Sequence, residues 1–357
     1  MLYFIIMDLN ILKVFGLSAF SFFIGILVAP VLAHYLYKYK AWKKNGSIKA
    51  ISGEEATIVN QYHKEKQVGT PRMGGLLIWL STILIIFIFW GIFNVFPNSL
   101  TEKLNFLSRS QTWLPVFALV SASVIGLVDD ILQVRGRGKY IGGGLSLTKR
   151  IILVALIGLI GGLWFYFKLE TSDILVPFWG HVEIGWLFVP FFVVIMLAVF
   201  SGGVIDGLDG LAGGIFASIF AAYSGVAFFQ NQVDLAAFCA VLTGAILAFL
   251  WFNIPPARFY MGETGILGLT AALTVVAFLT DSALVLPVIA FPLVIEAGSV
   301  IIQIFSKKFF KQKIFLAAPI HHHFEGRGWP NYKITMRFWV MGVVFAIIGM
   351  VIILVGK

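Results

Sequence analysis

Carboxylates and histidines gather in a few short polar stretches of an otherwise apolar chain. The residues of interest are Asp129, Asp130, Asp206, Asp209, Glu263, His321, His322 and His323. Carboxylate oxygens are the ligands that Mg²⁺ prefers in proteins. Histidines beside them can donate hydrogen bonds to phosphate or carry protons near neutral pH. The residue types therefore favour a site that binds Mg²⁺ and an anionic group such as phosphate.

The two aspartate pairs each have a structural and a functional interpretation. Asp129 and Asp130 directly follow an apolar segment, where they could simply cap a helix. Adjacent carboxylates repel, however, and keeping both near hydrocarbon is costly without a cation or a raised pKa. Asp206 and Asp209 stand three apart in "DGLDG", so on a helix they would share a face. The glycines there indicate either a tight turn or a backbone that approaches a phosphate or nucleoside.

Two further stretches carry polar residues at expected helix ends. In "NIPPA" the prolines keep the chain after Asn253 extended, and Glu263 in "MGETG" stands where a helix should begin. The histidines of "APIHHHFEGRGW" are adjacent, so a regular helix cannot aim all three at one ion. Their spacing is also unlike that of HExxH zinc sites. Phosphate donors, proton carriers and a plain interfacial loop stay open as interpretations.

The elements that must position these residues are long apolar segments. The chain has 357 residues, of which 59% are hydrophobic and 12% charged, and its mean hydropathy is +0.94. A soluble domain cannot bury that much apolar surface, whereas a bilayer accepts it. We expect an all-α polytopic membrane protein with about ten transmembrane helices in one domain, 1–357. The expected segments are 11–37, 74–96, 113–128, 151–167, 184–200, 208–229, 235–252, 264–280, 283–305 and 338–355.

Two smaller features narrow the class of protein. The first segment is too long for a cleavable signal peptide and has only Lys13 near its start, so we expect it to remain as a helix. The single cysteine, Cys239, lies inside an apolar segment. It excludes an internal disulfide and a metal site built from cysteines.

Positive charge is distributed unevenly over the expected loops. Alternate loops, beginning with the loop after the first segment, hold 20 of the 26 Lys and Arg residues. By the positive-inside rule these loops face the cytoplasm and both termini lie outside. All the polar stretches fall in these same loops, which predicts a composite site at one membrane interface. The net charge of +9 then reflects topology and contact with anionic lipid, or a role in substrate binding, and nucleic acid is not an expected partner.

The motifs, taken in order, resemble those of a known family. They are "TPRMGG", "VDD", "DGLDGLA", "WFNIPPARFYMGE" and "APIHHHFEGRGW". This set is similar to that of the bacterial phospho-N-acetylmuramoyl-pentapeptide transferase (MraY) family, within the polyprenyl-phosphate N-acetylhexosamine-1-phosphate transferase superfamily. The resemblance covers roughly residues 60–340, and the histidine run is its most specific part.

The resemblance implies an enzyme of peptidoglycan synthesis in the bacterial cytoplasmic membrane, with ten transmembrane helices and an active site facing the cytoplasm. It implies Mg²⁺-dependent transfer of phospho-MurNAc-pentapeptide from UDP-MurNAc-pentapeptide to undecaprenyl phosphate, giving lipid I and UMP. Asp129 or Asp130 would act on the lipid phosphate, in one step or through a covalent intermediate. Metal binding would fall to Glu263 and Asp206. Substrate binding would fall to Lys66, Thr70, Asp206, Asp209, Asn253, Tyr260, His321, His322 and His323.

Four positions depart from the family pattern. Glu263 replaces an aspartate, Gly203 an asparagine, Gln133 a lysine and Arg72 a threonine. They put catalytic efficiency in question but not the family.

Two rival functions remain. One is a sister enzyme that transfers GlcNAc-1-phosphate, and the other is a transporter, for which Glu296 would be the main buried carboxylate. A homodimer is compatible with the sequence, which does not set the oligomeric state.

Overall fold

Helices account for nearly all the regular structure of the chain. The computed structural model describes residues 9–44, 60, 61, 63, 68–108, 111–137 and 143–356. In hydrocarbon every backbone polar group must be hydrogen-bonded within the protein, and a helix achieves this within a single segment, so long apolar runs favour helices. The elements in chain order are η1 (Leu12–Gly16), α2 (Leu17–Lys38), α4 (Leu76–Val95), α5 (Ser99–Leu104), α6 (Trp113–Val134), α7 (Leu147–Lys168), β1 (Asp173–Val176), β2 (Gly180–Glu183), η2 (Gly185–Leu187), α8 (Phe188–Ser201), η3 (Gly202–Ile205), α9 (Leu211–Phe229), α10 (Val233–Asn253), α11 (Gly262–Leu279), α12 (Leu286–Ile289), α13 (Phe291–Phe309), α14 (Ile320–Gly326) and α15 (Asn331–Val355).

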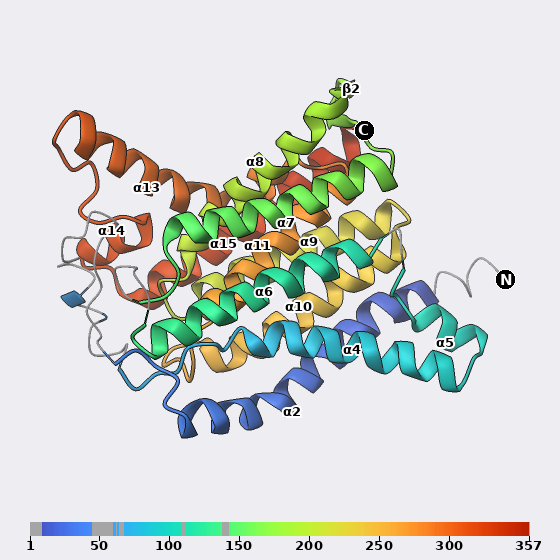
Figure 1. Cartoon of the computed structure of the whole chain (residues 1–357), viewed down its shortest axis with the longest axis horizontal. Coiled ribbons are helices and arrows are strands. Elements are labelled where there is room, and N and C mark those ends of the chain that lie inside the picture. The colour runs from blue at the N-terminus through green and yellow to red at the C-terminus, as the bar shows by residue number, and fades with distance from the viewer. Residues whose placement is uncertain are drawn as a thin grey trace.

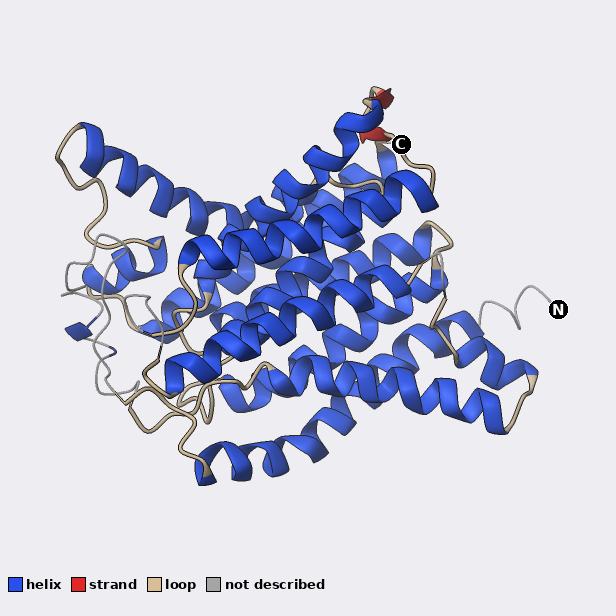
Figure 2. Cartoon of the chain, viewed as in Figure 1, coloured by secondary structure: helices blue, strands red, loops and turns tan. Residues whose placement is uncertain are grey.

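The all-α membrane architecture is confirmed. Within the described residues, nine helices are long and apolar enough to cross a bilayer, and each coincides with an expected segment. The strands of those residues form one short antiparallel hairpin, β1–β2, in which Asp173 is opposite Glu183 (Figure 2).

The expected segment 283–305 is built differently from the other nine. It is divided at Ala290 into the four-residue α12 and the longer α13. Pro292, in the first turn of α13, lacks the N–H that would continue α12 into α13, which explains the break; Pro287 stands in the first turn of α12, where a proline is tolerated. After it, α13 diverges from the bundle instead of running along it (Figure 1).

The loops divide between two ends of the bundle. One end, here called the site end, carries the polar loops 206–210 and 254–261 together with α14 (Figure 1). The opposite end, here called the hairpin end, carries β1–β2, and there the Phe178 N–H donates to the Gly356 carbonyl at 2.8 Å. The alternation of loops therefore matches the sequence prediction, while the cytoplasmic orientation of the site end stays a prediction.

Small residues let the central helices approach closely at the site end. A Cβ on Gly126 of α6 would lie 2.2 Å from the Glu263 carbonyl oxygen of α11. A Cβ on Gly268 of α11 would lie 2.0 Å from the Ser123 hydroxyl of α6. Such glycines allow backbones to touch in membrane bundles. They press the end of α6, which carries the adjacent aspartates, against the start of α11.

Candidate functional site

A polar pocket of about 230 Å³ opens at the site end. Residues from loops far apart in the sequence line it: Lys43, His63, Arg72, Val204, Asp206, Gly207, Leu208, Asp209, Asn253, Tyr260 and His322. Five of the predicted site residues therefore line one cavity: Asp206, Asp209, Asn253, Tyr260 and His322.

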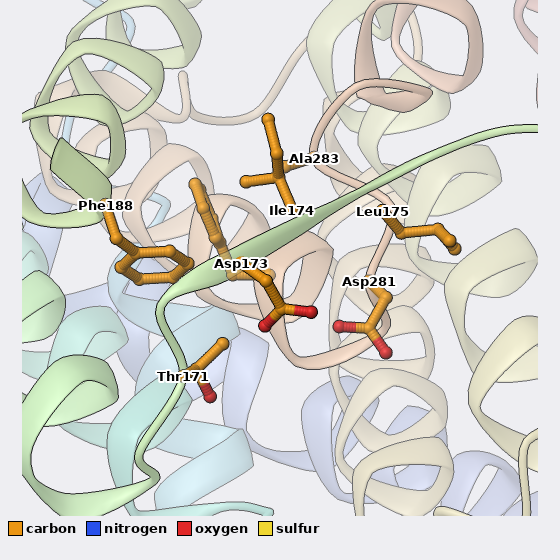
Figure 3. Close-up of a pocket in the computed structure, with 8 residues that line it drawn as sticks. Thr171, Asp173, Ile174, Leu175, Phe188, Asp281 and Ala283 are labelled. Atoms are coloured by element: carbon orange, nitrogen blue, oxygen red, sulfur yellow. The ribbon is translucent and has the colours of Figure 1, made fainter. Parts of the chain in front are cut away.

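A second, smaller pocket lies at the hairpin end. In Figure 3 the carboxylates of Asp173 and Asp281 turn toward each other, with Thr171 and Phe188 to their left. None of the predicted site residues lines it. The pocket at the site end is therefore the candidate functional site.

Asp129 and Asp130 lie within the last turns of α6, not at a helix cap, and both are fully buried. Asp129 accepts hydrogen bonds from the Leu145 N–H and from Gln133 Nε2, the latter at 2.8 Å. Asp130 Oδ2 accepts from the Thr264 N–H at 3.0 Å. Its other oxygen, Oδ1, has no hydrogen-bond partner among the residues that the structure describes. Asp130 is thus the carboxylate with acceptor capacity left for a ligand.

Gly262, at the start of α11, brings Asp130 and Asp206 together. Its N–H donates to Asp206 Oδ2 at 3.3 Å, and a Cβ built on it would lie 2.5 Å from Asp130 Oδ2. Its φ of 72° also favours glycine. Burial raises the pKa of Asp206 to about 6, against the opposing charge of Arg72. The two carboxylates therefore flank one backbone position that has no room for a side chain.

Glu263 is ion-paired to a residue that the sequence reasoning missed. Arg150, near the start of α7, donates from Nη1 to Glu263 Oε1 at 2.6 Å and lies 3.9 Å from Asp129. The sequence marks Arg150 only as a basic residue directly before the expected segment 151–167. The predicted metal ligand thus already has a cationic partner.

Asn253 connects two of the motifs. Its Oδ1 accepts from the Gly210 N–H at 2.9 Å, and its Nδ2 donates to the Phe259 carbonyl at 2.9 Å. Asp209 adds a second link, accepting from the Ala257 N–H at 3.3 Å. Both amide atoms of Asn253 hold loop 206–210 against loop 254–261, which is a structural role beside the substrate contact that was predicted.

Tyr260 lines the pocket, whereas the predicted Thr70 does not line it and instead forms a hydrogen bond with the Tyr260 hydroxyl. The Tyr260 N–H donates to the Pro71 carbonyl at 2.8 Å. Burial, together with the charge of Asp209, raises the pKa of the Tyr260 hydroxyl, while a hydrogen bond with Thr70 opposes this shift. The predicted Lys66 falls outside the described residues.

Two cations of the pocket were not assigned from the sequence. Arg72 Nε lies 3.7 Å from Asp130 Oδ1 and has no hydrogen-bond partner within the described part of the chain. Lys43 also lines the pocket, and burial followed by the charge of Arg72 lowers its pKa to about 7. The pocket thus combines carboxylates with cations that can bind an anion.

The three histidines on α14 turn to different partners, as adjacent helical residues must. His321 Nδ1 bonds to Glu296 Oε2 of α13 at 2.9 Å, and both side chains are inaccessible to solvent. His323 Nδ1 accepts from the Leu316 N–H at 3.1 Å. His322 alone of the three lines the pocket.

His322 belongs to a group that includes residues the sequence reasoning did not assign. Its Nδ1 lies 2.5 Å from Glu325 Oε2, and His63 Nε2 lies 2.8 Å from Glu325 Oε1. The ligand atoms of these three residues lie within 4.8 Å of one another, and in the described part of the chain no other His, Cys, Asp or Glu trio does so. Glu263 and Asp206 therefore do not form such a trio. Their assignment to a metal stays a prediction.

Comparison with known proteins identifies the family. Residues 112–281 match the glycosyl transferase family 4. The chain is 33% identical over 345 residues to the phospho-N-acetylmuramoyl-pentapeptide-transferase of Geobacillus thermodenitrificans, covering 94% of this chain and 96% of that protein. It is 33% identical to the enzyme of that name from Pelagibacter ubique, covering 81% of each chain, and 35% identical to that from Dichelobacter nodosus, covering 80% of each. The chain therefore belongs to the phospho-N-acetylmuramoyl-pentapeptide transferase family.

Proposed function

We propose that the chain transfers phospho-MurNAc-pentapeptide from UDP-MurNAc-pentapeptide to undecaprenyl phosphate, forming lipid I and releasing UMP. One observation carries the proposal. Buried Asp130, whose Oδ1 has no hydrogen-bond partner among the described residues, lies 3.7 Å from Arg72, and Arg72 lines the same pocket as Asp206 at one end of a membrane bundle. A site at this position can receive a lipid phosphate from the interface and a nucleotide from water.

The cations of the pocket suit a diphosphate. Phosphoryl transfer depends mainly on positioning and on neutralising charge that develops on the phosphate oxygens. Arg72 and Lys43 line the same cavity as Asp206, so they can hold the diphosphate of the nucleotide there. Tyr260 lines the cavity as well and offers an aromatic ring to the base.

In the proposed reaction an oxygen of the lipid phosphate attacks the phosphorus attached to the sugar. The new P–O bond forms as the diphosphate bond breaks, and UMP leaves with the electron pair. Asp130 accepts the proton of the lipid phosphate, since its Oδ1 has spare acceptor capacity. The rival is a covalent aspartyl-phosphate intermediate.

We also propose Mg²⁺ as the cofactor. The fit rests on Asp130 Oδ2 and Asp206 Oδ2, the carboxylate oxygens that meet at Gly262, while Asp130 Oδ1 is left to accept the proton. When bound there, the ion would offset charge on the diphosphate. Glu263 could join these carboxylates only by leaving Arg150, which holds it at 2.6 Å.

The remaining parts of the proposal concern location and partners. The excess of Lys and Arg in the loops of the site end supports a bacterial inner membrane protein whose active site faces the cytoplasm. A homodimer stays a prediction from the sequence.

The deciding experiment offers the purified enzyme UDP-MurNAc-pentapeptide or UDP-GlcNAc, each with radiolabelled undecaprenyl phosphate. We expect a labelled lipid product and UMP with the first nucleotide only. Product with UDP-GlcNAc alone would assign the sister reaction, and no product with either would reject transferase activity on these substrates.

Replacing Glu263 with aspartate tests the metal proposal. Glu263→Asp withdraws the carboxylate from Arg150 by about one bond length, about 1.5 Å, so we expect Mg²⁺-dependent turnover to be retained or improved. If Glu263→Ala leaves the Mg²⁺ dependence of UMP release unchanged, Glu263 is not a ligand and the ion is held without it.

A further inference from the structure

Glu325 lies between two histidines that are far apart in the sequence. His322 is on the same short helix, whereas His63 is 262 residues away. His63 Nε2 is 2.8 and 3.0 Å from the two oxygens of Glu325, and His322 Nδ1 is 2.5 Å from Oε2. All three side chains are buried, and both histidines line the pocket.

These distances fit hydrogen bonds better than a metal centre. Two ligands of one zinc ion, each at about 2.0–2.1 Å in a tetrahedral site, are separated by well over 3 Å. His322 Nδ1 and Glu325 Oε2 approach to 2.5 Å, which is too close for two ligands of one ion and is nearer to the short N–H···O distance of a charge-assisted hydrogen bond. The carboxylate therefore accepts one N–H from each imidazole.

The protonation states follow from the same contacts. Burial opposes the ionisation of Glu325, but the bonds from His322 and His63 outweigh it and lower its pKa to about 2. Burial, followed by the proximity of His321, lowers the pKa of His322 to about 4 despite the bond to Glu325. Around neutral pH the carboxylate is thus ionised and the ring of His322 is neutral.

A neutral imidazole has one donor and one acceptor nitrogen. An ionised carboxylate can only accept, so the proton of His322 must be on Nδ1. The nitrogen left for a ligand in the pocket, Nε2, is then an acceptor. An acceptor facing a fully ionised phosphate oxygen would be repelled.

We propose that His63 and Glu325 are positioning residues that hold His322 in the Nδ1–H form, so that Nε2 accepts a hydrogen bond from the substrate. The group bound there carries a donor hydrogen, which is a hydroxyl or amide N–H of the sugar nucleotide or the protonated oxygen of the lipid phosphate. The inference rests on the proposed function and, of the interpretations that the sequence left open for the histidines, it favours for His322 a proton acceptor over a donor to phosphate.

The tautomer can be measured without turnover. Protein labelled with ¹⁵N-histidine is compared with the His322→Asn variant to assign the His322 signals at neutral pH. We expect a protonated Nδ1 and an unprotonated Nε2 in the wild type, and a mixture of tautomers in Glu325→Gln. A proton on Nε2, or an imidazolium, in the wild type would overturn the proposal.

Kinetics separate positioning from mere structure. Loss of a hydrogen bond to a charged group predicts a fall of about 10- to 100-fold in kcat/KM for Glu325→Gln. His63→Gln, whose amide N–H replaces that of Nε2, should retain most activity, whereas His63→Phe should fall with Glu325→Gln. Asp173→Asn is the matched control, since it alters a histidine–carboxylate pair at the hairpin end, and its activity should equal that of the wild type.

The two sources of the donor hydrogen differ in which KM changes. In His322→Asn the KM for the nucleotide rises if the donor belongs to the sugar or peptide, and the KM for undecaprenyl phosphate rises if it belongs to the lipid phosphate. Unchanged kinetics in Glu325→Gln and His322→Asn would refute the proposal, as would stoichiometric zinc in the wild type that is absent from His63→Phe. If the wild type made no product at all, the proposed function would fail, while the tautomer measurement would still test His322.

Discussion

Both ends of the bundle carry a histidine paired through Nδ1 with a carboxylate. At the hairpin end His181 pairs with Asp173, and these side chains are 55% and 32% exposed. At the site end His321 pairs with Glu296, and both are 0% exposed. An exposed pair is screened by water and contributes little to stability, whereas burying both groups is costly. The same pairing therefore costs little desolvation free energy at the hairpin end and much more at the site end.

The buried pair at the site end connects two helices. His321 and Glu296 join α14 to α13, the helix that diverges from the bundle. The atoms of this pair that face away from each other, His321 Nε2 and Glu296 Oε1, have no hydrogen-bond partner among the described residues. The pair at the site end therefore keeps two buried polar atoms that could still form hydrogen bonds, whereas the pair at the hairpin end is exposed to water.

The largest difference in turnover should appear between variants that neutralise one carboxylate at each end of the bundle. Asp130→Asn removes a buried carboxylate with a free oxygen, and we expect kcat to fall about 10²- to 10⁴-fold, the range for loss of a general base. UMP release measures the effect, and thermal unfolding should show the fold intact. Asp173→Asn should be as active as the wild type. Equal activity in both variants would remove Asp130 from the mechanism.

The packing of His321 gives the next largest effect. A Cβ on Gly207 would lie 2.2 Å from His321 Nε2, so Gly207→Ala must displace the ring or the loop. We expect kcat/KM to fall about tenfold, equivalent to about 1.4 kcal/mol. Gly298→Ala on α13, where a Cβ meets nothing within 4 Å, is the matched control. A full-activity Gly207→Ala enzyme would show that the position of His321 is unimportant.

Lys43 should make nucleotide binding depend on pH. Because its pKa is lowered to about 7, its positive charge is present below pH 7 and lost above it. We expect kcat/KM for the nucleotide to fall about fivefold as the charge is lost, equivalent to about 1 kcal/mol. Lys43→Arg keeps its charge, so its profile should lack this decline. A decline of the same size in Lys43→Arg would assign the titration to another group.

The smallest effect on turnover is expected from the hairpin end. Lys13 of η1 bonds to Asp234 of α10 at 2.5 Å. Lys13→Met leaves that carboxylate, 26% exposed, without its cation, so the free energy of unfolding should fall by about 1–3 kcal/mol while kcat/KM stays unchanged. Denaturant unfolding measures the loss, and Lys13→Met/Asp234→Met should recover part of it. A drop in kcat/KM at full stability would contradict the separation of the two ends.

The fold could be predicted largely because apolar length is a local property. Nine of the ten expected segments are single helices, and their boundaries follow from where charges and glycines resume. The tenth is broken beside Pro287 and Pro292, which were visible in the sequence. Length and hydropathy alone do not reveal that α13 would then leave the bundle, because that direction depends on tertiary contacts.

The site was predictable in its residue types but not in its pairings. The motifs did gather at one end, as alternation of loops requires. The pairs Arg150–Glu263 and His63–Glu325 join residues 113 and 262 positions apart, and nothing periodic in the sequence marks them. Single cations and lone histidines carry no pattern of their own, so their partners became known only when the chain path was known.

The bond between Lys13 and Asp234 has a consequence for how the protein is made. Lys13 is almost fully enclosed, and its partners, Asp234 and the Asn105 carbonyl, both come later in the chain. During synthesis the first segment therefore enters the bilayer before the counter-ion of its ammonium group has been made, because Asp234 lies 221 residues later in the chain. Until α10 emerges from the ribosome, that segment must be sheltered by the insertion machinery or hold its charge at the lipid headgroups.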